Sequence, residues 1–157
     1  MTTLHHHVHT ADCHTKAERL AEADALVQDK GARFTAMRRA TYDFLLAQQA
    51  PLSAYDILAK LETRLKKKLA PPTVYRALDF LLAQGLIHRL ETNSSYLVCD
   101  HPGAAHDSVY LVCTECGTTQ EVDDHAVGDL LHAKAQAYGF RPSKQVIEVQ
   151  GRCQRCR

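Results

Sequence analysis

The chain has 157 residues, of which 45% are apolar and 24% charged, enough for one ordinary domain or two small ones. No apolar run approaches the roughly 20 residues that span a bilayer, and the N-terminus lacks the apolar core of an export signal, which argues against membrane and exported proteins. We therefore expect a cytoplasmic protein with no membrane partner, in which paired cysteines bind metal more often than they form disulfides.

The net charge of +1 conceals two halves of opposite charge. Residues 16–90 carry 13 Lys or Arg against 8 Asp or Glu, whereas residues 91–157 carry 6 against 9. This asymmetry indicates two domains with different partners, although an unevenly charged solvated surface would look the same. Residues 1–15, which contain HHHVH, are expected to form a flexible tail with no specific role.

Four helices are predicted in the basic half. Residues 16–30 have an apolar face at helical spacing, and Thr35 is placed to cap a second helix. Ser53 and Asp56 have the spacing of a capping box at the start of SAYDILAKLETRL. The fourth helix, PPTVYRALDFLLAQG, begins with proline and ends at Gly85.

The fourth helix has an apolar face and a polar face. The apolar residues at helical spacing, expected in the core, are Val74, Leu78, Leu81 and Leu82. Thr73, Tyr75 and Arg76 then face outward near the start of the helix. An arginine can bind a guanine edge with two hydrogen bonds, and an aromatic ring can pack on a thymine methyl group. A merely solvated basic face is the alternative for each residue taken singly.

Two short extended runs, LIHRLE and SYLVC, follow the fourth helix and are joined by a polar turn at residues 92–94. Helices followed by a hairpin are typical of a winged helix-turn-helix, whose last helix enters the DNA major groove. We therefore predict a DNA-binding domain over residues 16–100. The residues expected to contact bases or phosphates are Tyr75, Arg76, Thr73, Tyr55, Arg38, Arg39 and Lys67.

A second domain is predicted over residues 107–157, after a linker at residues 101–106. Strands SVYLVC and TTQEV precede a helix with Val127, Leu130 and Leu131 on its inward face, and KQVIEVQG is a third strand. About 50 residues rarely build a sufficient core alone, so a structural metal, dimerisation or both are expected. The predicted fold class is α+β, with a winged helix-turn-helix and a small α/β dimerisation domain.

Four of the six cysteines form two Cys-x-x-Cys pairs, Cys113 with Cys116 and Cys153 with Cys156. This spacing lets both sulfurs of a pair reach one zinc ion, and four thiolates close the coordination sphere. Such a site supports folding rather than catalysis. Free thiols or disulfides are the alternative reading.

The stretches APPTVYRALDFLLAQGLIHRLETNSSYLVC and LVCTECGTTQEV closely resemble the ferric uptake regulator superfamily, and more narrowly its zinc-uptake branch. The resemblance covers roughly residues 16–157. It implies a homodimeric regulator that is not an enzyme, has no small-molecule substrate, and with bound zinc represses zinc uptake genes at palindromic operators. It also implies that the paired cysteines hold structural zinc.

The resemblance further implies a regulatory zinc site, and so about two zinc ions per subunit. Its ligands would be His88, Cys99, His106 and Glu121, with His101 as the possible alternative to His106. Two neutral imidazoles, one thiolate and one carboxylate neutralise Zn²⁺, and the thiolate favours zinc over Fe²⁺ and Mn²⁺. Because these ligands span the domain boundary, bound zinc is expected to fix the two winged helices at the spacing of successive major grooves.

Three alternatives remain open from the sequence. An iron, manganese or peroxide sensor of the same superfamily is the nearest one, although this chain has only HDS where iron-sensing relatives carry an HHDH run. A zinc hydrolase would use the regulatory site with bound water, but no HExxH or similar base-bearing motif is present. A structural zinc module that only mediates protein contacts is the third.

Overall fold

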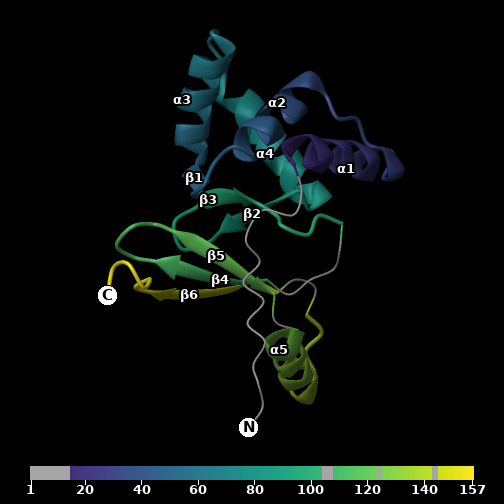
Figure 1. The fold of residues 1–157 in the computed structure, drawn as a ribbon. Coiled ribbons are helices and arrows are strands. Elements are labelled where there is room, and N and C mark those ends of the chain that lie inside the picture. Colours follow the sequence, from purple (N-terminus) through teal and green to yellow (C-terminus); the bar gives the residue numbers. More distant parts are fainter. Residues whose placement is uncertain (1–14, 104–107, 124, 143–144) are drawn as a thin grey trace.

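The structure is a computed structural model that describes residues 15–103, 108–123, 125–142 and 145–157. Helices gather at one end of the molecule and a small sheet with one further helix lies at the other, with the wing between them (Figure 1). The predicted tail, apart from Thr15, and His106 in the predicted linker lie outside the described residues. Within the described ranges, no helix is both long enough and apolar enough to cross a bilayer.

The four N-terminal helices form as expected, with bounds α1 Lys16–Asp29, α2 Ala36–Leu45, α3 Ala54–Leu65 and α4 Pro71–Gln84. The Ser53 side chain accepts a hydrogen bond from the Asp56 backbone N–H at 3.1 Å, so the predicted cap at the start of α3 is present. Gly85 ends α4 with a φ of 73°, a conformation that favours glycine. Thr35 precedes α2 without a side-chain cap.

The helices enclose one apolar core. Val74, Leu78 and Leu81 on α4 are fully buried, which confirms the predicted inward face, and Leu82 packs partly buried against the same cluster. Tyr42 of α2 and Ile57 of α3 are likewise fully buried in it. The opposite face of α4 is thereby held toward solvent.

The wing is a three-stranded sheet with the order β1-β3-β2 (β1 Leu52–Ser53, β2 Ile87–Leu90, β3 Ser95–Val98). The β2–β3 hairpin is the one that the alternating pattern predicts, with Ile87 opposite Val98. β1 is not predicted from the sequence, because two residues are too few to show alternation. It forms because the chain entering α3 runs antiparallel to β3.

The C-terminal sheet has the order β5-β4-β6 (β4 Ser108–Cys113, β5 Thr119–Asp123, β6 Ile147–Gly151). β4 pairs with β5 antiparallel and with β6 parallel. Helix α5 (His125–Ala137) connects β5 to β6. Tyr110 and Val112 of this sheet form a second buried cluster with Leu90 and Leu97 of the wing, so the two sheets are packed together there.

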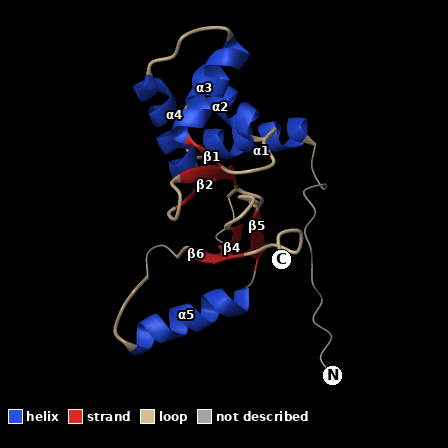
Figure 2. Ribbon diagram, turned by 90° about the vertical axis from the view of Figure 1, so that its left-hand side faces the viewer, coloured by secondary structure: helices blue, strands red, loops and turns tan. Residues whose placement is uncertain are grey.

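The inward face predicted for the last helix is not buried within the chain. Leu130 is 60% exposed and Leu131 is 42% exposed, and Figures 1 and 2 both show α5 standing apart from the sheet. Helical spacing identifies an apolar face but does not say whether its partner belongs to the same chain. The other exposed large apolar residues of this half are Leu111, Tyr138, Phe140, Val146 and Val149.

Candidate metal centres and nucleic-acid interface

The four paired cysteines converge at one end of the C-terminal sheet. The sulfurs of Cys113, Cys116, Cys153 and Cys156 all lie within 4.8 Å of one another. Zinc–sulfur bonds of about 2.3 Å in a tetrahedron place the sulfurs about 3.8 Å apart, and Cys116 Sγ and Cys153 Sγ are separated by 3.8 Å. The arrangement therefore fits a closed tetrathiolate zinc site.

Backbone hydrogen bonds shape the tight turn within each Cys-x-x-Cys pair, which is called a knuckle below. The first follows β4 and the second follows β6, and these strands are parallel neighbours, which brings the two turns together. The Gly117 N–H donates to the Cys113 carbonyl at 3.0 Å, with Gly117 at a φ of 71°, where a side chain would be strained. The Cys156 N–H closes the second turn on the Cys153 carbonyl at 2.9 Å.

The cluster loses its first protons easily and its last with difficulty. The Cys153 backbone N–H, which donates to Cys113 Sγ at 3.4 Å, and the Cys116 N–H lower the pKa of Cys113 to about 6. Hydrogen bonding with Thr118 lowers the pKa of Cys116 as well. The neighbouring Cys153 and Cys116 sulfurs raise the pKa of Cys156 to about 12. A divalent cation offsets this mutual repulsion, so metal binding and proton release are coupled.

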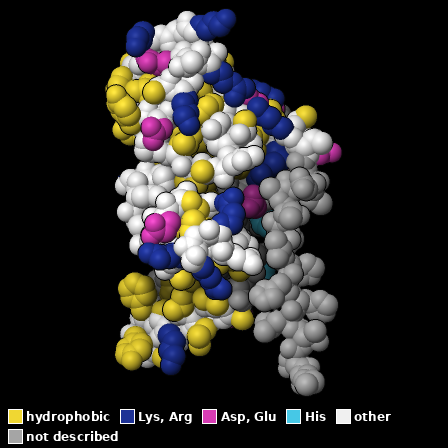
Figure 3. All heavy atoms as spheres, turned by 60° about the vertical axis from the view of Figure 1, so that its left-hand side comes forward, with side chains coloured by type: hydrophobic (Ala, Val, Ile, Leu, Met, Phe, Trp, Pro, Cys, Tyr) yellow, Lys and Arg dark blue, Asp and Glu magenta, His cyan; other side chains and the backbone are white. Residues whose placement is uncertain are grey.

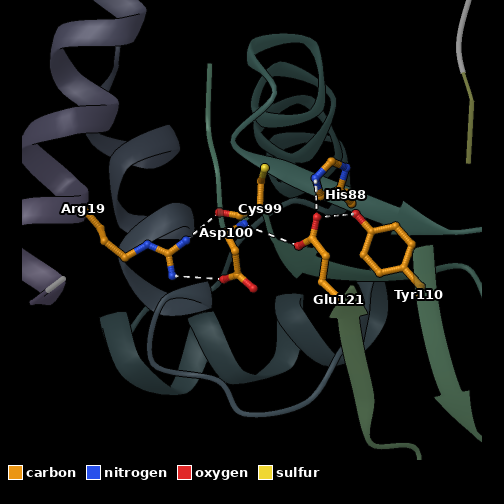
Figure 4. A network of polar contacts seen from close by, with 6 residues as sticks. All are labelled: Arg19, His88, Cys99, Asp100, Tyr110 and Glu121. Atoms are coloured by element: carbon orange, nitrogen blue, oxygen red, sulfur yellow. Dashed lines mark hydrogen bonds and ion pairs between the residues drawn. The ribbon is translucent and has the colours of Figure 1, made fainter. Parts of the chain in front are cut away.

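Three of the predicted regulatory ligands meet where the wing lies against the C-terminal sheet (Figure 4). His88 comes from β2, Cys99 directly follows β3, and Glu121 comes from β5. His88 Nε2 lies 3.9 Å from Glu121 Oε1, and the side chains are 26% and 6% exposed respectively. The Asp100 backbone N–H donates to Glu121 Oε2 at 3.5 Å, which ties the end of the wing to β5.

Tyr110 supports this group from the middle strand of the sheet. Its ring lies 5.5 Å from the His88 ring, centroid to centroid, and its hydroxyl donates to Glu121 Oε1 at 3.4 Å. Tyr110 is the direct neighbour of Glu121 across β4 and β5. Tyr110 is not among the residues predicted from the sequence, because the alternation of SVYLVC does not give the register of this strand against TTQEV.

Cys99 is fully buried, and its environment disfavours the thiolate. Burial, followed by the charge of Glu121, raises the pKa of Cys99 to about 12. Arg19 of α1 donates to the Cys99 carbonyl at 2.5 Å and lies 3.6 Å from the Asp100 carboxylate, as Figure 4 shows. Arg19 is not among the residues predicted from the sequence, because it is one of several charged residues along α1.

The donor atoms of His88, Cys99 and Glu121, the predicted regulatory ligands, are less closely spaced than the sulfurs of the paired cysteines. Within the described ranges, the paired cysteines are the one set of three or more candidate ligands whose donor atoms all lie that close together. His101 is half-buried two residues after Cys99, and its backbone hydrogen bond favours the Cys99 thiolate. The choice between His106 and His101 as fourth ligand stays a prediction, since His106 lies outside the described residues.

The residues predicted to contact DNA fall into two groups. Those with exposed side chains are Tyr55, Thr73, Tyr75, Arg76 and Lys67. The other two have partners within the helical domain: the half-buried Arg38 guanidinium stacks 3.7 Å above the Phe80 ring and donates to the Arg33 carbonyl, and Arg39, which is also exposed, pairs with Asp24. Figure 3 shows Lys and Arg side chains over the helical end and an apolar patch at the opposite end.

Comparison with known proteins shows which family this chain is similar to. The model of the ferric uptake regulator family matches residues 29–150. The zinc uptake regulation protein of Escherichia coli (strain K12) is 37% identical over 145 residues, which cover 90% of this chain and 83% of the relative. A solved zinc uptake regulator complexed with zinc and DNA is 37% identical, with a TM-score of 0.83 over 91% of this chain and 95% of that one.

Two structures of XcZur differ in their likeness to this fold. The holo structure is 34% identical and has a TM-score of 0.78 over 90% of this chain and 98% of that one. The apo structure is 35% identical and covers 90% and 97%, but its TM-score is 0.52. Since identity and coverage barely change, the arrangement described here is closer to the holo form. The α+β fold predicted from the sequence is confirmed, and the chain belongs to the ferric uptake regulator family.

Proposed function

We propose that this protein is a zinc-responsive transcription regulator, mainly a repressor of zinc uptake genes, which binds palindromic operator DNA as a zinc-loaded homodimer. The observation that carries the proposal is the meeting of His88, Cys99 and Glu121 where the wing lies against the C-terminal sheet. The family and the zinc uptake regulation relative support the same reading.

Two zinc sites per subunit have different tasks in this proposal. The paired cysteines hold a structural ion that fastens the C-terminal tail to the end of β4. The second site has one thiolate instead of four, so its metal exchanges more readily, as a sensor requires. When bound there, zinc supplies a positive charge that imidazole, thiolate and carboxylate donors share.

The second site couples zinc to domain orientation, because its donors come from the wing and from β5. A ligand changes a conformational equilibrium only by binding one state better than the other. Donors from two domains meet that condition, since zinc binds them all at once only in one arrangement. The closer likeness to holo XcZur than to apo XcZur supports a link between metal occupancy and arrangement in this family.

DNA binding is assigned to the exposed face of α4. Arg76 and Tyr75 lie near its start, and Gly85 and the buried face fix the helix on the core. A dimer presents two such helices, and the half-site spacing follows from their separation. The exposed apolar side chains of α5 and the C-terminal sheet are the surface assigned to the second copy.

Metal-dependent DNA binding tests this function. Zinc-loaded protein should select a palindromic duplex from a random library and release it on chelation. Protein loaded with Fe²⁺ or Mn²⁺ should select nothing comparable. A response to Fe²⁺ or Mn²⁺ but not to Zn²⁺ would instead assign the protein to iron or manganese sensing. Absence of DNA selection with every metal would leave only a structural zinc module.

Replacing Arg76 with alanine should weaken binding to the selected duplex by about 1–3 kcal/mol and relax the preference at one base pair. The reason is that an exposed arginine near the start of the recognition helix can make a bidentate contact with a guanine edge. Fluorescence anisotropy across single-base variants of the duplex measures the loss. Lys67→Ala is the matched control, since a phosphate contact is lost uniformly across sequences; equal profiles for both variants would show that Arg76 also contacts phosphate.

A further inference from the structure

The turn of the wing rests on β6 through one carboxylate. Glu148 Oε1 accepts a hydrogen bond from the Glu91 backbone N–H at 2.6 Å, and Oε2 accepts one from the Thr92 backbone N–H at 3.1 Å. The Thr92 hydroxyl also donates to Oε2. Gln150, two residues along the same face of β6, donates to the Thr92 hydroxyl at 3.2 Å. A strand distant in sequence therefore holds two backbone N–H groups at the start of the turn.

This contact lies at the opposite end of the hairpin from the regulatory ligands. Across the C-terminal sheet, Glu121, Tyr110 and Glu148 are direct neighbours in the registers of β5, β4 and β6. Neighbours in register share one face of a sheet, and this face is turned to the wing. Glu121 contacts the open end of the hairpin at His88, and Glu148 contacts the closed end at Thr92.

The Glu148 contact is that of an ionised carboxylate. Partial burial alone would raise the pKa of Glu148, but the hydrogen bonds from the Thr92 hydroxyl and from the Glu91 and Thr92 N–H groups outweigh it, and the pKa is lowered. Hydrogen bonds to an ionised acceptor are about twice as strong as neutral ones. The partners of Glu148 are groups of Glu91 and Thr92, neither of which is a predicted metal ligand.

We propose that Glu148 is a positioning residue of the DNA-binding domain, which fixes the wing turn on β6 and so sets the wing's orientation at a second point besides the regulatory site. A hairpin held at one end can rotate about that end, whereas two separated contacts on one sheet face define its direction. Zinc then completes an orientation that Glu148 already restricts. The consequence for DNA binding rests on the function proposed above, but the contact itself does not.

The contact is tested by amide hydrogen exchange in the zinc-loaded dimer of the full chain. In Glu148→Gln the side chain keeps its shape but loses the charge and one accepting oxygen, so the Glu91 and Thr92 amides should exchange roughly tenfold faster or more. Glu22→Gln, the same change at an exposed glutamate on α1, should leave both rates unchanged. Unchanged rates in Glu148→Gln would overturn the proposal.

Positioning is separated from simple stability by two DNA probes, the palindromic duplex selected by the wild type and a duplex with one half-site. Glu148→Gln should weaken palindrome binding roughly tenfold and leave half-site binding unchanged, because only the palindrome requires both winged helices at one spacing. Equal weakening on both duplexes would show a merely structural role and refute positioning. If the zinc-loaded wild type bound neither duplex, the proposed function would fail, while the amide rates would still decide whether Glu148 fixes the turn.

Discussion

Cys153→Ser is expected to remove one zinc ion per subunit and to lower the melting temperature by roughly 20 °C or more. A structural zinc ion contributes about 10–16 kcal/mol in small domains, and each kcal/mol shifts the melting temperature by about 2–4 °C in a chain of this length. Cys153 contacts both cysteines of the first pair: its sulfur lies 3.8 Å from Cys116 Sγ, and its N–H donates to Cys113 Sγ. Serine supplies no thiolate at neutral pH.

Native mass spectrometry and thermal melting measure the two effects. Gln154→Ala, an exposed neighbour in the same knuckle, is the matched control and should keep both zinc ions and the wild-type melting temperature. Stripping the wild type with a strong chelator should reproduce the loss seen in Cys153→Ser. A wild-type melting curve for Cys153→Ser would refute the structural role of the cluster.

The elements of the helical half were predicted because their signals are local. The apolar spacing of α4 identified the residues that prove buried, and the capping pattern at Ser53 and Asp56 located the start of α3. The two cysteine pairs were predicted as metal-binding turns for the same reason, since each Cys-x-x-Cys turn consists of four consecutive residues. The sulfurs of both pairs meet because β4 and β6 are parallel neighbours, which spacing alone does not show.

Contacts between residues far apart in the sequence are not predicted by any such local pattern. His88, Cys99 and Glu121 were assigned through a family resemblance, and their spacing alone did not predict that they meet. Arg19 and Glu148 each hold backbone groups about 55 to 80 residues away, and a charged side chain that binds a distant backbone resembles any solvated charge in the sequence. The exposed face of α5 was misassigned for a related reason, because its expected partner is another chain.

These distant contacts also explain why the wing can serve as the sensing element. Its open end carries two of the predicted zinc ligands, and Leu90 and Leu97 of its two strands pack on Tyr110 and Val112. Its base follows directly from α4, whose exposed face is assigned to DNA. Any rotation of the hairpin against the sheet is therefore expected to move α4 with it.

Cys99→Ser is expected to keep the dimer and the structural zinc but to abolish tight zinc binding at the second site. Loss of an outer partner of a metal site already costs 10–100-fold in affinity, so loss of a thiolate ligand should cost more than about 100-fold. Zinc content should fall from two ions per subunit to one. The zinc-dependent gain in affinity for the selected duplex should fall by about 5–150-fold, the usual range of coupling between two sites.

The competing explanation is that Cys99 only fills the core, since it is fully buried at the end of β3. Cys99→Ala separates the two, because alanine is apolar and fits the space but cannot bind metal. A ligand role predicts the same loss of zinc and DNA response for alanine and serine, with wild-type-like melting for alanine. A packing role predicts that alanine retains both zinc ions. Among the histidines, His106→Ala should share the loss and His101→Ala should not; the reverse result would identify His101 as the fourth ligand.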